Sequence, residues 1–224
     1  MTPPTPRSMP AADSLSPEAR ETVSRFHTLF YSESGWRQNH WLGVRVLKSP
    51  FDLWIYQEIL FEQRPDVIVE CGTARGGSAY FLASMLDLIG AGRVITIDIE
   101  HRDGRPAHPR ITYLTGSSTD PEIVSAVQDS IGPNERAMVI LDSDHARDHV
   151  LAEMKIYGPL VTEGHYLIVE DTNVNGHPIL PNHGPGPMEA VEAFLVDERQ
   201  RWRVSRQCER LLLTFNPRGF LRRK

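Results

Sequence analysis

Acidic residues follow two apolar segments that have the character of buried strands. The segment "VILDSDHARDH" (139–149) runs from apolar residues into Asp142, and "YLIVED" (166–171) ends in Glu170 and Asp171. One strand–helix–strand unit separates the two sets, so they are expected at the ends of neighbouring strands. Carboxylate oxygens suit Mg²⁺, whereas zinc prefers several His or Cys ligands. We therefore predict that Asp142, Glu170 and Asp171 bind Mg²⁺; the alternative is that they merely cap a loop and a helix.

A histidine lies three residues beyond the first of these acids. At the start of the following helix, the imidazole of His145 can point into the site and take a proton from a hydroxyl, so we predict that it is a general base. Nearby carboxylates would raise its pKa and Mg²⁺ would lower it, so the sequence does not decide the direction. Asp144 could face the same side, but Asp142 directly ends the strand and is preferred as the ligand. His149 is expected on the helix surface or behind the site.

A glycine-rich segment follows an earlier apolar strand. In "VECGTARGGS" (69–78) the glycines allow the backbone to approach a ligand, and the next helix offers free N–H groups. The spacing does not fit G-x-G-x-x-G, which weakens a nicotinamide hypothesis. Asp98, one strand later, is placed to accept hydrogen bonds from ribose hydroxyls; a tight turn without a ligand is the alternative. Ser117 would lie near the adenine, or in a plain serine-rich turn. The predicted nucleoside-binding residues are Glu70, Gly72, Gly76, Gly77, Ser78, Asp98, Ser117 and Asp142.

Alternating strands and helices are expected to position these residues. Near-continuous apolar strands separated by helices predict an α/β, Rossmann-like fold, with a mostly parallel seven-stranded sheet flanked by helices. Ligands in such sheets bind outside the carboxyl ends of the strands, where the acids gather. The last two strands, "WRVS" (202–205) and "RLLLTF" (210–215), are predicted to form an antiparallel pair at the sheet edge. The other predicted strands span residues 66–70, 93–100, 110–116, 137–142 and 166–171.

The chain divides into three predicted parts. The first 17 residues hold five prolines and few apolar side chains, and residues 1–15 are expected to be a disordered tail. Residues 16–63 are predicted to form an N-terminal helical covering segment, with Ser16 and Ser49 as N-caps of its helices. Residues 64–224 are predicted to form the nucleoside-binding catalytic domain.

Composition restricts the class of protein. A net charge of −5 over 224 residues argues against a general nucleic-acid binder. The two cysteines have no paired spacing, which is typical of reduced thiols in a cytoplasmic protein. No apolar run reaches the ~18 residues of a membrane span, and no signal peptide is evident, so we expect no membrane partner.

Several motifs together resemble the cephalosporin hydroxylase family. They are "WLGVRVLKSPFDLWIYQEIL", "VIVECGTARGGSA", "VILDSDHARDHVLAEM" and "GHYLIVEDTNVNG", in the right order over roughly residues 36–200. The resemblance implies a class I methyltransferase fold that binds S-adenosyl-L-methionine. The metal residues are also similar to those of Mg²⁺-dependent macrolide sugar O-methyltransferases, whose ligand and base positions fall on Asp142, Glu170, Asp171 and His145. We expect no counterpart of the large N-terminal domain of those enzymes.

We therefore expect a Mg²⁺-dependent O-methyltransferase that acts on a small-molecule hydroxyl acceptor, a sugar or a secondary metabolite, as in antibiotic biosynthesis. A homo-oligomer is expected. Residues 31–48 and 172–187 are expected to build the acceptor pocket, the latter as a lid or as a rigid loop. Two alternatives remain: a hydroxylase, as the family name suggests, and a non-catalytic partner that binds S-adenosylmethionine to support a biosynthetic oxygenase. A hydroxylase with non-haem iron would need two His and one carboxylate, which an acidic cluster fits badly.

Overall fold

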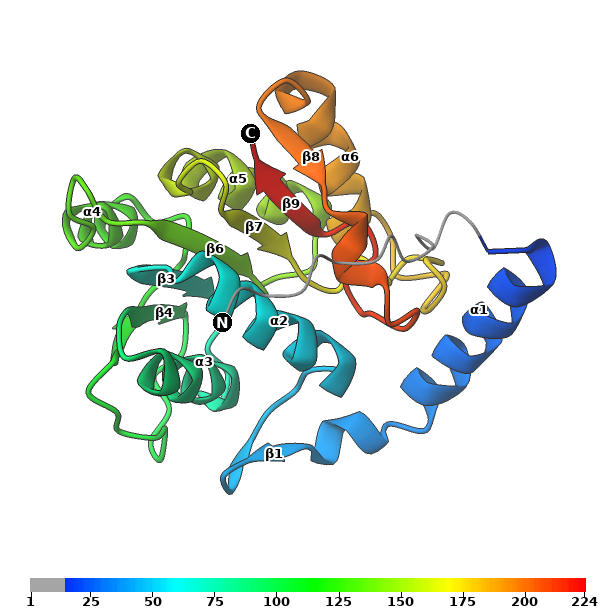
Figure 1. Cartoon of the computed structure of the whole chain (residues 1–224), viewed down its shortest axis with the longest axis horizontal. Helices are drawn as coiled ribbons and strands as arrows, with labels where there is room; N and C mark the ends of the chain where they lie inside the picture. Colours follow the sequence, from blue (N-terminus) through cyan, green and yellow to red (C-terminus); the bar gives the residue numbers. More distant parts are fainter. Residues whose placement is uncertain (1–14) are drawn as a thin grey trace, which may run out of the picture.

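A seven-stranded sheet lies at the centre of the molecule in the computed structural model, which describes residues 15–224 (Figure 1). The five strands that pair β5-β4-β3-β6-β7 are parallel, and β9 and β8 close one edge as antiparallel strands. The predicted fold class is confirmed. The strands are β3 (Val67–Cys71), β4 (Arg93–Asp98), β5 (Ile111–Thr115), β6 (Ala137–Leu141), β7 (Tyr166–Val169), β8 (Trp202–Val204) and β9 (Phe220–Arg223).

The chain order reverses at the middle of this sheet. From β3 it proceeds outward to β4 and β5, then returns to the other side of β3 as β6. The carboxyl ends of β3 and β6 therefore flank the switch point, which is where ligands bind in open α/β sheets. Gly72 and Asp142 are the first residues after these two strands.

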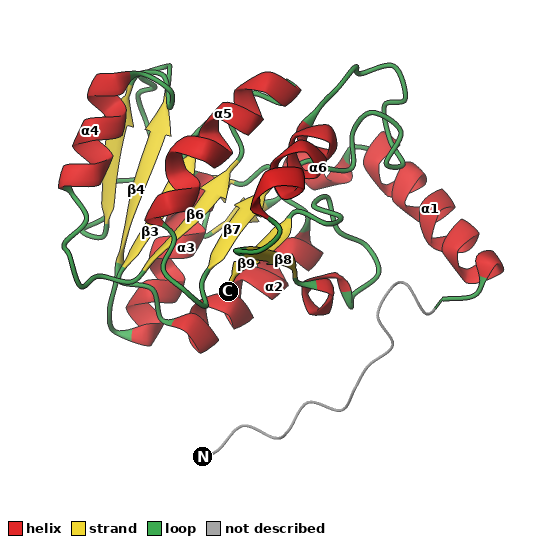
Figure 2. Ribbon diagram, turned by 90° about the horizontal axis from the view of Figure 1, so that it is seen from above, coloured by secondary structure: helices red, strands yellow, loops and turns green. Residues whose placement is uncertain are grey.

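Helices cover both faces of the sheet (Figure 2). Side chains alternate between the faces along each strand: Val67 and Val69 pack with the helices α4, α5 and α6, whereas Ile68 packs with α2 and α3. Burial of these two apolar layers is the main force that holds the sheet in place. The helices are α2 (Pro50–Gln63), α3 (Gly77–Ile89), α4 (Pro121–Asp129), α5 (Arg147–Tyr157) and α6 (Pro187–Glu198), with short 3₁₀ turns at Gly35–Gln38, Gly158–Leu160 and Arg206–Glu209.

The N-terminal part of the chain extends away from the sheet. Helix α1 (Pro17–Ser32) lies at the side of the body in Figure 1, where His27 stacks on Phe215, and it is followed by a small hairpin of β1 (His40–Trp41) and β2 (Val44–Arg45). The predicted caps are confirmed, since Ser16 and Ser49 each accept a backbone hydrogen bond at the start of their helices. The predicted tail, apart from Leu15, lies outside the described residues. No helix within residues 15–224 is long and apolar enough to cross a lipid bilayer.

Two boundaries differ from the sequence-based expectation. The segment 210–215 is not a strand, and the strand that pairs with the edge strand β8 is Phe220–Arg223 instead. The carboxylate of Asp52 accepts hydrogen bonds from Thr214 Oγ1 at 2.5 Å and from the Phe215 backbone N at 2.9 Å, so this segment is bonded to α2 rather than to a strand. The helix expected from His145 begins at Arg147, which leaves His145 in the loop after β6.

Candidate active site

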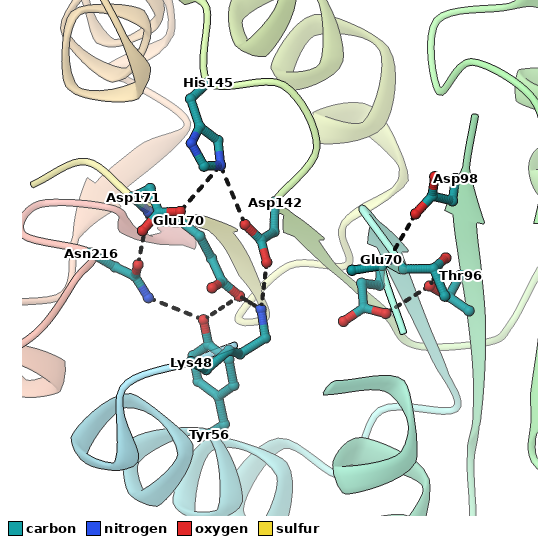
Figure 3. A network of polar contacts seen from close by, with 12 residues as sticks. Lys48, Tyr56, Glu70, Thr96, Asp98, Asp142, His145, Glu170, Asp171 and Asn216 are labelled. Carbon is teal, nitrogen blue, oxygen red and sulfur yellow. Dashed lines mark hydrogen bonds and ion pairs between the residues drawn. The ribbon is translucent and has the colours of Figure 1, made fainter. Parts of the chain in front are cut away.

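Two predicted metal ligands and the predicted base meet at the ends of β6 and β7. These strands are parallel neighbours, and Asp142 and Asp171 follow them closely. His145 Nε2 lies 3.1 Å from Asp171 Oδ2 and 3.6 Å from Asp142 Oδ1 (Figure 3). One ligand atom from each of the three residues lies within 4.8 Å of the others, which is a spacing that a single metal ion can bridge. The two carboxylates supply the oxygen ligands that Mg²⁺ prefers, and the imidazole lies beside them.

The backbone aims Asp171 at this cluster. Its φ of 52° lies in the left-handed region, which turns the chain sharply after β7. The backbone N of Asp171 donates a 3.1 Å hydrogen bond to Asn216 Oδ1 from the segment before β9. A contact with a remote part of the chain therefore stabilises an unfavourable conformation that directs the carboxylate towards His145.

The carboxylate of Glu170 points to the other side, towards α2. Glu170 Oε1 accepts hydrogen bonds from Lys48 Nζ at 2.5 Å and from Tyr56 Oη at 2.8 Å. Lys48 Nζ also lies 2.8 Å from Asp142 Oδ2, so one ammonium bridges two of the predicted ligands (Figure 3). Lys48 was not among the predicted site residues, because nothing in the segment before α2 indicates that its side chain is buried.

Burial and neighbouring charges alter the pKa values of these groups. Burial lowers the pKa of His145, but Asp142 and Asp171 outweigh it and raise that pKa to about 9. Burial also raises the pKa of Asp171 to about 6, against the effect of His145. For Lys48, burial acts downwards, but the carboxylates of Asp142 and Glu170 raise its pKa above the usual range. The cluster is thus built from charged groups that stabilise one another in a shielded place.

A cavity of about 690 Å³ opens beside this cluster. Its lining includes Asp142, His145 and Asp171 on one side and Asp98 with the glycine-rich segment on the other. Of the predicted nucleoside-binding residues, Gly72, Gly77, Ser78, Asp98 and Asp142 line it, whereas Glu70, Gly76 and Ser117 do not.

Two glycines are required by close backbone contacts at the floor of the cavity. A Cβ on Gly72 would lie 1.8 Å from the carbonyl O of Asp142, and a Cβ on Gly77 would lie 2.0 Å from the carbonyl O of Arg45. Neither position admits a side chain. The first contact joins the glycine-rich segment to the acidic cluster, and the second joins α3 to the hairpin of the covering segment.

Asp98 holds the glycine-rich segment in position. Its carboxylate accepts hydrogen bonds from the backbone N of Ala74 at 2.7 Å and of Glu100 at 2.9 Å. Arg105 lies 3.2 Å from the same carboxylate and donates to the carbonyl O of Ala74. The side chain of Arg105 is 6% exposed, and no motif in the sequence indicates that Arg105 lies at the site.

Glu70 lies beneath the cavity as a buried carboxylate. Its Oε2 accepts a 2.6 Å hydrogen bond from Thr96 Oγ1, whereas its Oε1 is buried with no hydrogen-bond partner among the described residues. Burial raises the pKa of Glu70 above its usual range. An unpartnered buried carboxylate oxygen costs free energy, and Glu70 is fully buried and does not line the cavity.

Ser118, rather than Ser117, lines the cavity after β5. Its hydroxyl donates to Glu153 Oε1, which also accepts a 2.7 Å hydrogen bond from Ser143 and lies 3.4 Å from His149 Nε2. His149 is therefore held by a buried carboxylate of its own helix and lies apart from the three residues that can share a metal ion.

The long loop after β7 is fixed by hydrogen bonds. Glu189 on α6 accepts from Asn175 Nδ2 at 2.8 Å and from the backbone N of Gly186 at 2.7 Å, and it lies 3.1 Å from His177 Nε2. The backbone N of Arg147 donates to the carbonyl O of Pro185. These contacts favour the rigid loop over the mobile lid.

Known proteins resemble this chain over most of its length. The family model described as "Rhamnosyl O-methyltransferase/CmcI" matches residues 33–224. A rhamnosyl O-methyltransferase of Mycobacterium leprae is 42% identical over 213 residues, which cover 90% of each chain. One of Mycobacterium tuberculosis is 42% identical over 179 residues, covering 77% of this chain and 72% of the relative. A solved structure of CmcI with Mg and SAM is 25% identical with a TM-score of 0.63, covering 85% of this chain and 78% of its own.

Proposed function

We propose that this chain, which belongs to the Rhamnosyl O-methyltransferase/CmcI family, methylates a hydroxyl group of a sugar. It is an S-adenosylmethionine-dependent O-methyltransferase, and its cofactors are S-adenosyl-L-methionine and Mg²⁺. Which residues of this chain bind them, and which part of the acceptor is methylated, are proposals argued below.

One observation carries the proposal: residues suited to bind the methyl donor and residues suited to bind the cation line the same cavity. The glycine-rich segment and Asp98 form one wall, and Asp142, His145 and Asp171 form another. A nucleoside held against the first wall and a hydroxyl held at the second would lie within one cavity. Such pre-arrangement of two reactants accounts for much of the acceleration in transfer reactions.

The first wall fits the methyl donor. Gly72, Gly77 and Ser78 line this wall, and α3 begins at Gly77, so the free N–H groups at its N-terminus are available to a ligand in the cavity. Asp98 lies at the carboxyl end of β4, where its carboxylate can accept hydrogen bonds from ribose hydroxyls. When bound, S-adenosylmethionine supplies an activated methyl group.

The second wall fits the cation. Asp142 and Asp171 would hold Mg²⁺, with Glu170 as the third proposed carboxylate, although in the structure Glu170 is bonded to Lys48 and Tyr56. Asp144 is the weaker candidate, because its carboxylate accepts a 2.8 Å hydrogen bond from the backbone N of Ala146. When bound, Mg²⁺ lowers the pKa of a coordinated hydroxyl group.

His145 is the proposed general base. Its Nε2 lies beside the two carboxylates that would hold the cation, so a hydroxyl at that position would be within reach of the imidazole. The acceptor hydroxyl would lose its proton to Nε2. The pKa of about 9 reflects the charges of Asp142 and Asp171, and neutralising them would bring the imidazole back towards its neutral, proton-accepting form.

The covering segment supplies surfaces that suit a sugar. Tyr31, Trp36 and Leu47 line the same cavity as His145. Aromatic rings offer broad apolar faces with a polar edge, against which the apolar face of a deoxysugar ring can pack. Arg37 and Arg45 also line the cavity and can donate hydrogen bonds to hydroxyls.

An acceptor screen tests the proposal. The purified chain is incubated with S-adenosylmethionine, Mg²⁺ and a panel of rhamnosides, glucosides and catechols, and S-adenosylhomocysteine is quantified. Methylation of rhamnosides is expected, with no turnover by the Asp142→Asn variant. Turnover of catechols with no sugar methylated would overturn the choice of acceptor. Fe²⁺-dependent oxidation of an acceptor would instead support a hydroxylase activity. The cluster has one histidine and two carboxylates, however, whereas a non-haem iron site uses two histidines and one carboxylate.

Two further expectations remain proposals. Exposed apolar side chains on α1 and α2, among them Leu29 at 56% and Trp54 at 60% exposure, support a homo-oligomer. Light scattering of the intact chain would test it. The buried free thiols of Cys71 and Cys208 are compatible with a cytoplasmic location, which fractionation of the source cells would test.

A further inference from the structure

Lys48 is fixed between two carboxylates of the proposed cation site. Its side chain is 2% exposed, and its Nζ lies 2.8 Å from Asp142 Oδ2 and 2.5 Å from Glu170 Oε1. The carbonyl O of Lys48 accepts a 3.1 Å hydrogen bond from Asn39 Nδ2, and the next residue, Ser49, caps α2. Both the backbone and the ammonium group of this lysine are thus held in place.

The ammonium occupies bonding positions that a divalent cation would use. Glu170 Oε1 is shared between Lys48 and Tyr56, whose hydroxyl also receives a 3.1 Å hydrogen bond from Asn216 Nδ2. This network turns Glu170 towards α2, away from His145 (Figure 3). The two carboxylate oxygens of Asp142 face different partners: Oδ2 lies near Lys48, and Oδ1 lies near His145.

We propose that Lys48 is a positioning residue that weakens the binding of the divalent cation. Its positive charge offsets one of the three negative charges of Asp142, Glu170 and Asp171, and it competes directly for Asp142 and Glu170. Because the group is buried, its repulsion of a second cation is little reduced by solvent. The cation is then held weakly by the protein itself, and oxygens of the acceptor complete its coordination. This inference rests on the proposed function.

The test is direct measurement of cation affinity in the intact chain. Lys48→Met keeps the length of the side chain and removes its charge, and Lys155→Met is a matched control because Lys155 is an exposed lysine of α5. Mn²⁺ binding is followed by electron paramagnetic resonance of the free ion, and Mg²⁺ binding by calorimetry. Lys48→Met should bind both ions about 10-fold more tightly or better, and Lys155→Met should match the wild type. A purely structural lysine predicts equal or weaker binding in Lys48→Met, and that result would overturn the inference.

A charge-balanced variant separates electrostatics from rearrangement. Lys48→Met with Glu170→Gln removes one charge of each sign, so the gain in affinity should disappear; a gain that persists would contradict the proposal. If Lys48→Met does not fold, Lys48→Gln, which retains a hydrogen-bond donor, decides the question by the same measurement. Absence of Mn²⁺ and Mg²⁺ binding by both the wild type and Lys48→Met would instead refute the metal site of the proposed function.

Discussion

His145 Nε2 lies 3.1 Å from Asp171 Oδ2, although the two residues follow different strands. The parallel pairing of β6 and β7 brings them together, and the loop position of His145 before α5 leaves its ring free to face the cavity. This relationship makes the base and the cation site one unit, and it leads to separable predictions.

Replacing His145 should slow chemistry without weakening cofactor binding. His145→Ala is expected to lower kcat by about 10²–10⁴-fold, which is the usual contribution of a positioned base. Affinity for S-adenosylhomocysteine, measured by calorimetry, should stay near the wild-type value. His101→Ala is the control, since His101 is exposed and does not line the cavity. Near-normal turnover of His145→Ala would exclude it as the base.

Removal of the cation should abolish turnover. Asp142→Asn should lose Mg²⁺ binding because it removes a carboxylate of the cluster, whereas Asp144→Asn should retain it, because Asp144 bonds to the backbone of its own loop. Treatment with EDTA should stop methyl transfer by the wild type, and Mg²⁺ or Mn²⁺ should restore it. Full activity after rigorous metal removal would disprove the site.

Loss of the Asp98 carboxylate should weaken cofactor binding. Asp98→Ala removes the proposed ribose acceptor and the bond to the Ala74 backbone, so we expect binding weaker by roughly 1–3 kcal/mol in calorimetry. Asp103→Ala, at a fully exposed carboxylate in the following loop, is the control. Unchanged affinity in a folded Asp98→Ala variant would remove Asp98 from the nucleoside site.

His27 should make the fold sensitive to acid. Burial lowers the pKa of His27 to about 4, below its ordinary value of 6.5. Between these pH values the unfolded chain binds a proton that the folded chain does not, so stability present above pH 6.5 is lost as the pH falls towards 4. Because each pKa unit corresponds to about 1.4 kcal/mol, the fall of the His27 pKa from 6.5 to about 4 corresponds to a loss of roughly 3 kcal/mol in the free energy of unfolding.

Chemical denaturation across this pH range measures that effect. His27→Gln cannot be protonated, so its free energy of unfolding should change less between pH 6.5 and pH 4 than that of the wild type. His101→Gln, in an exposed loop, should behave like the wild type. Equal pH dependence in wild type and His27→Gln would show that other groups govern acid unfolding.

The parallel core of the fold was predictable because its strands carry a local signal. Apolar runs such as Val67–Cys71 and Ala137–Leu141 are short, continuous and separated by helices with clear caps. The last strand of the chain was not predictable, since "RLLLTF" is as apolar as a strand but is bonded to Asp52, which lies 162 residues before Thr214 in the chain. Hydrogen bonds between remote residues leave no periodic pattern.

Some residues of the candidate site were likewise predictable from the sequence, and others were not. Asp142, Asp171 and His145 could be placed from strand ends alone, because a parallel sheet gathers its carboxyl ends at one edge. Lys48 and Arg105 could not, since each reaches the site from a separate segment through a long, flexible side chain. The direction of Glu170 depends on Lys48 and was equally hidden.

The contact between Gly72 and the carbonyl of Asp142 has a thermodynamic consequence. One piece of backbone belongs to both walls of the cavity, with no side chain between them to absorb a displacement. A ligand that shifts the glycine-rich turn must therefore also shift the residue that presents the first carboxylate. We expect the affinities for methyl donor and cation to be linked, each ligand changing the dissociation constant of the other by the same factor, as reciprocity requires of any two coupled sites.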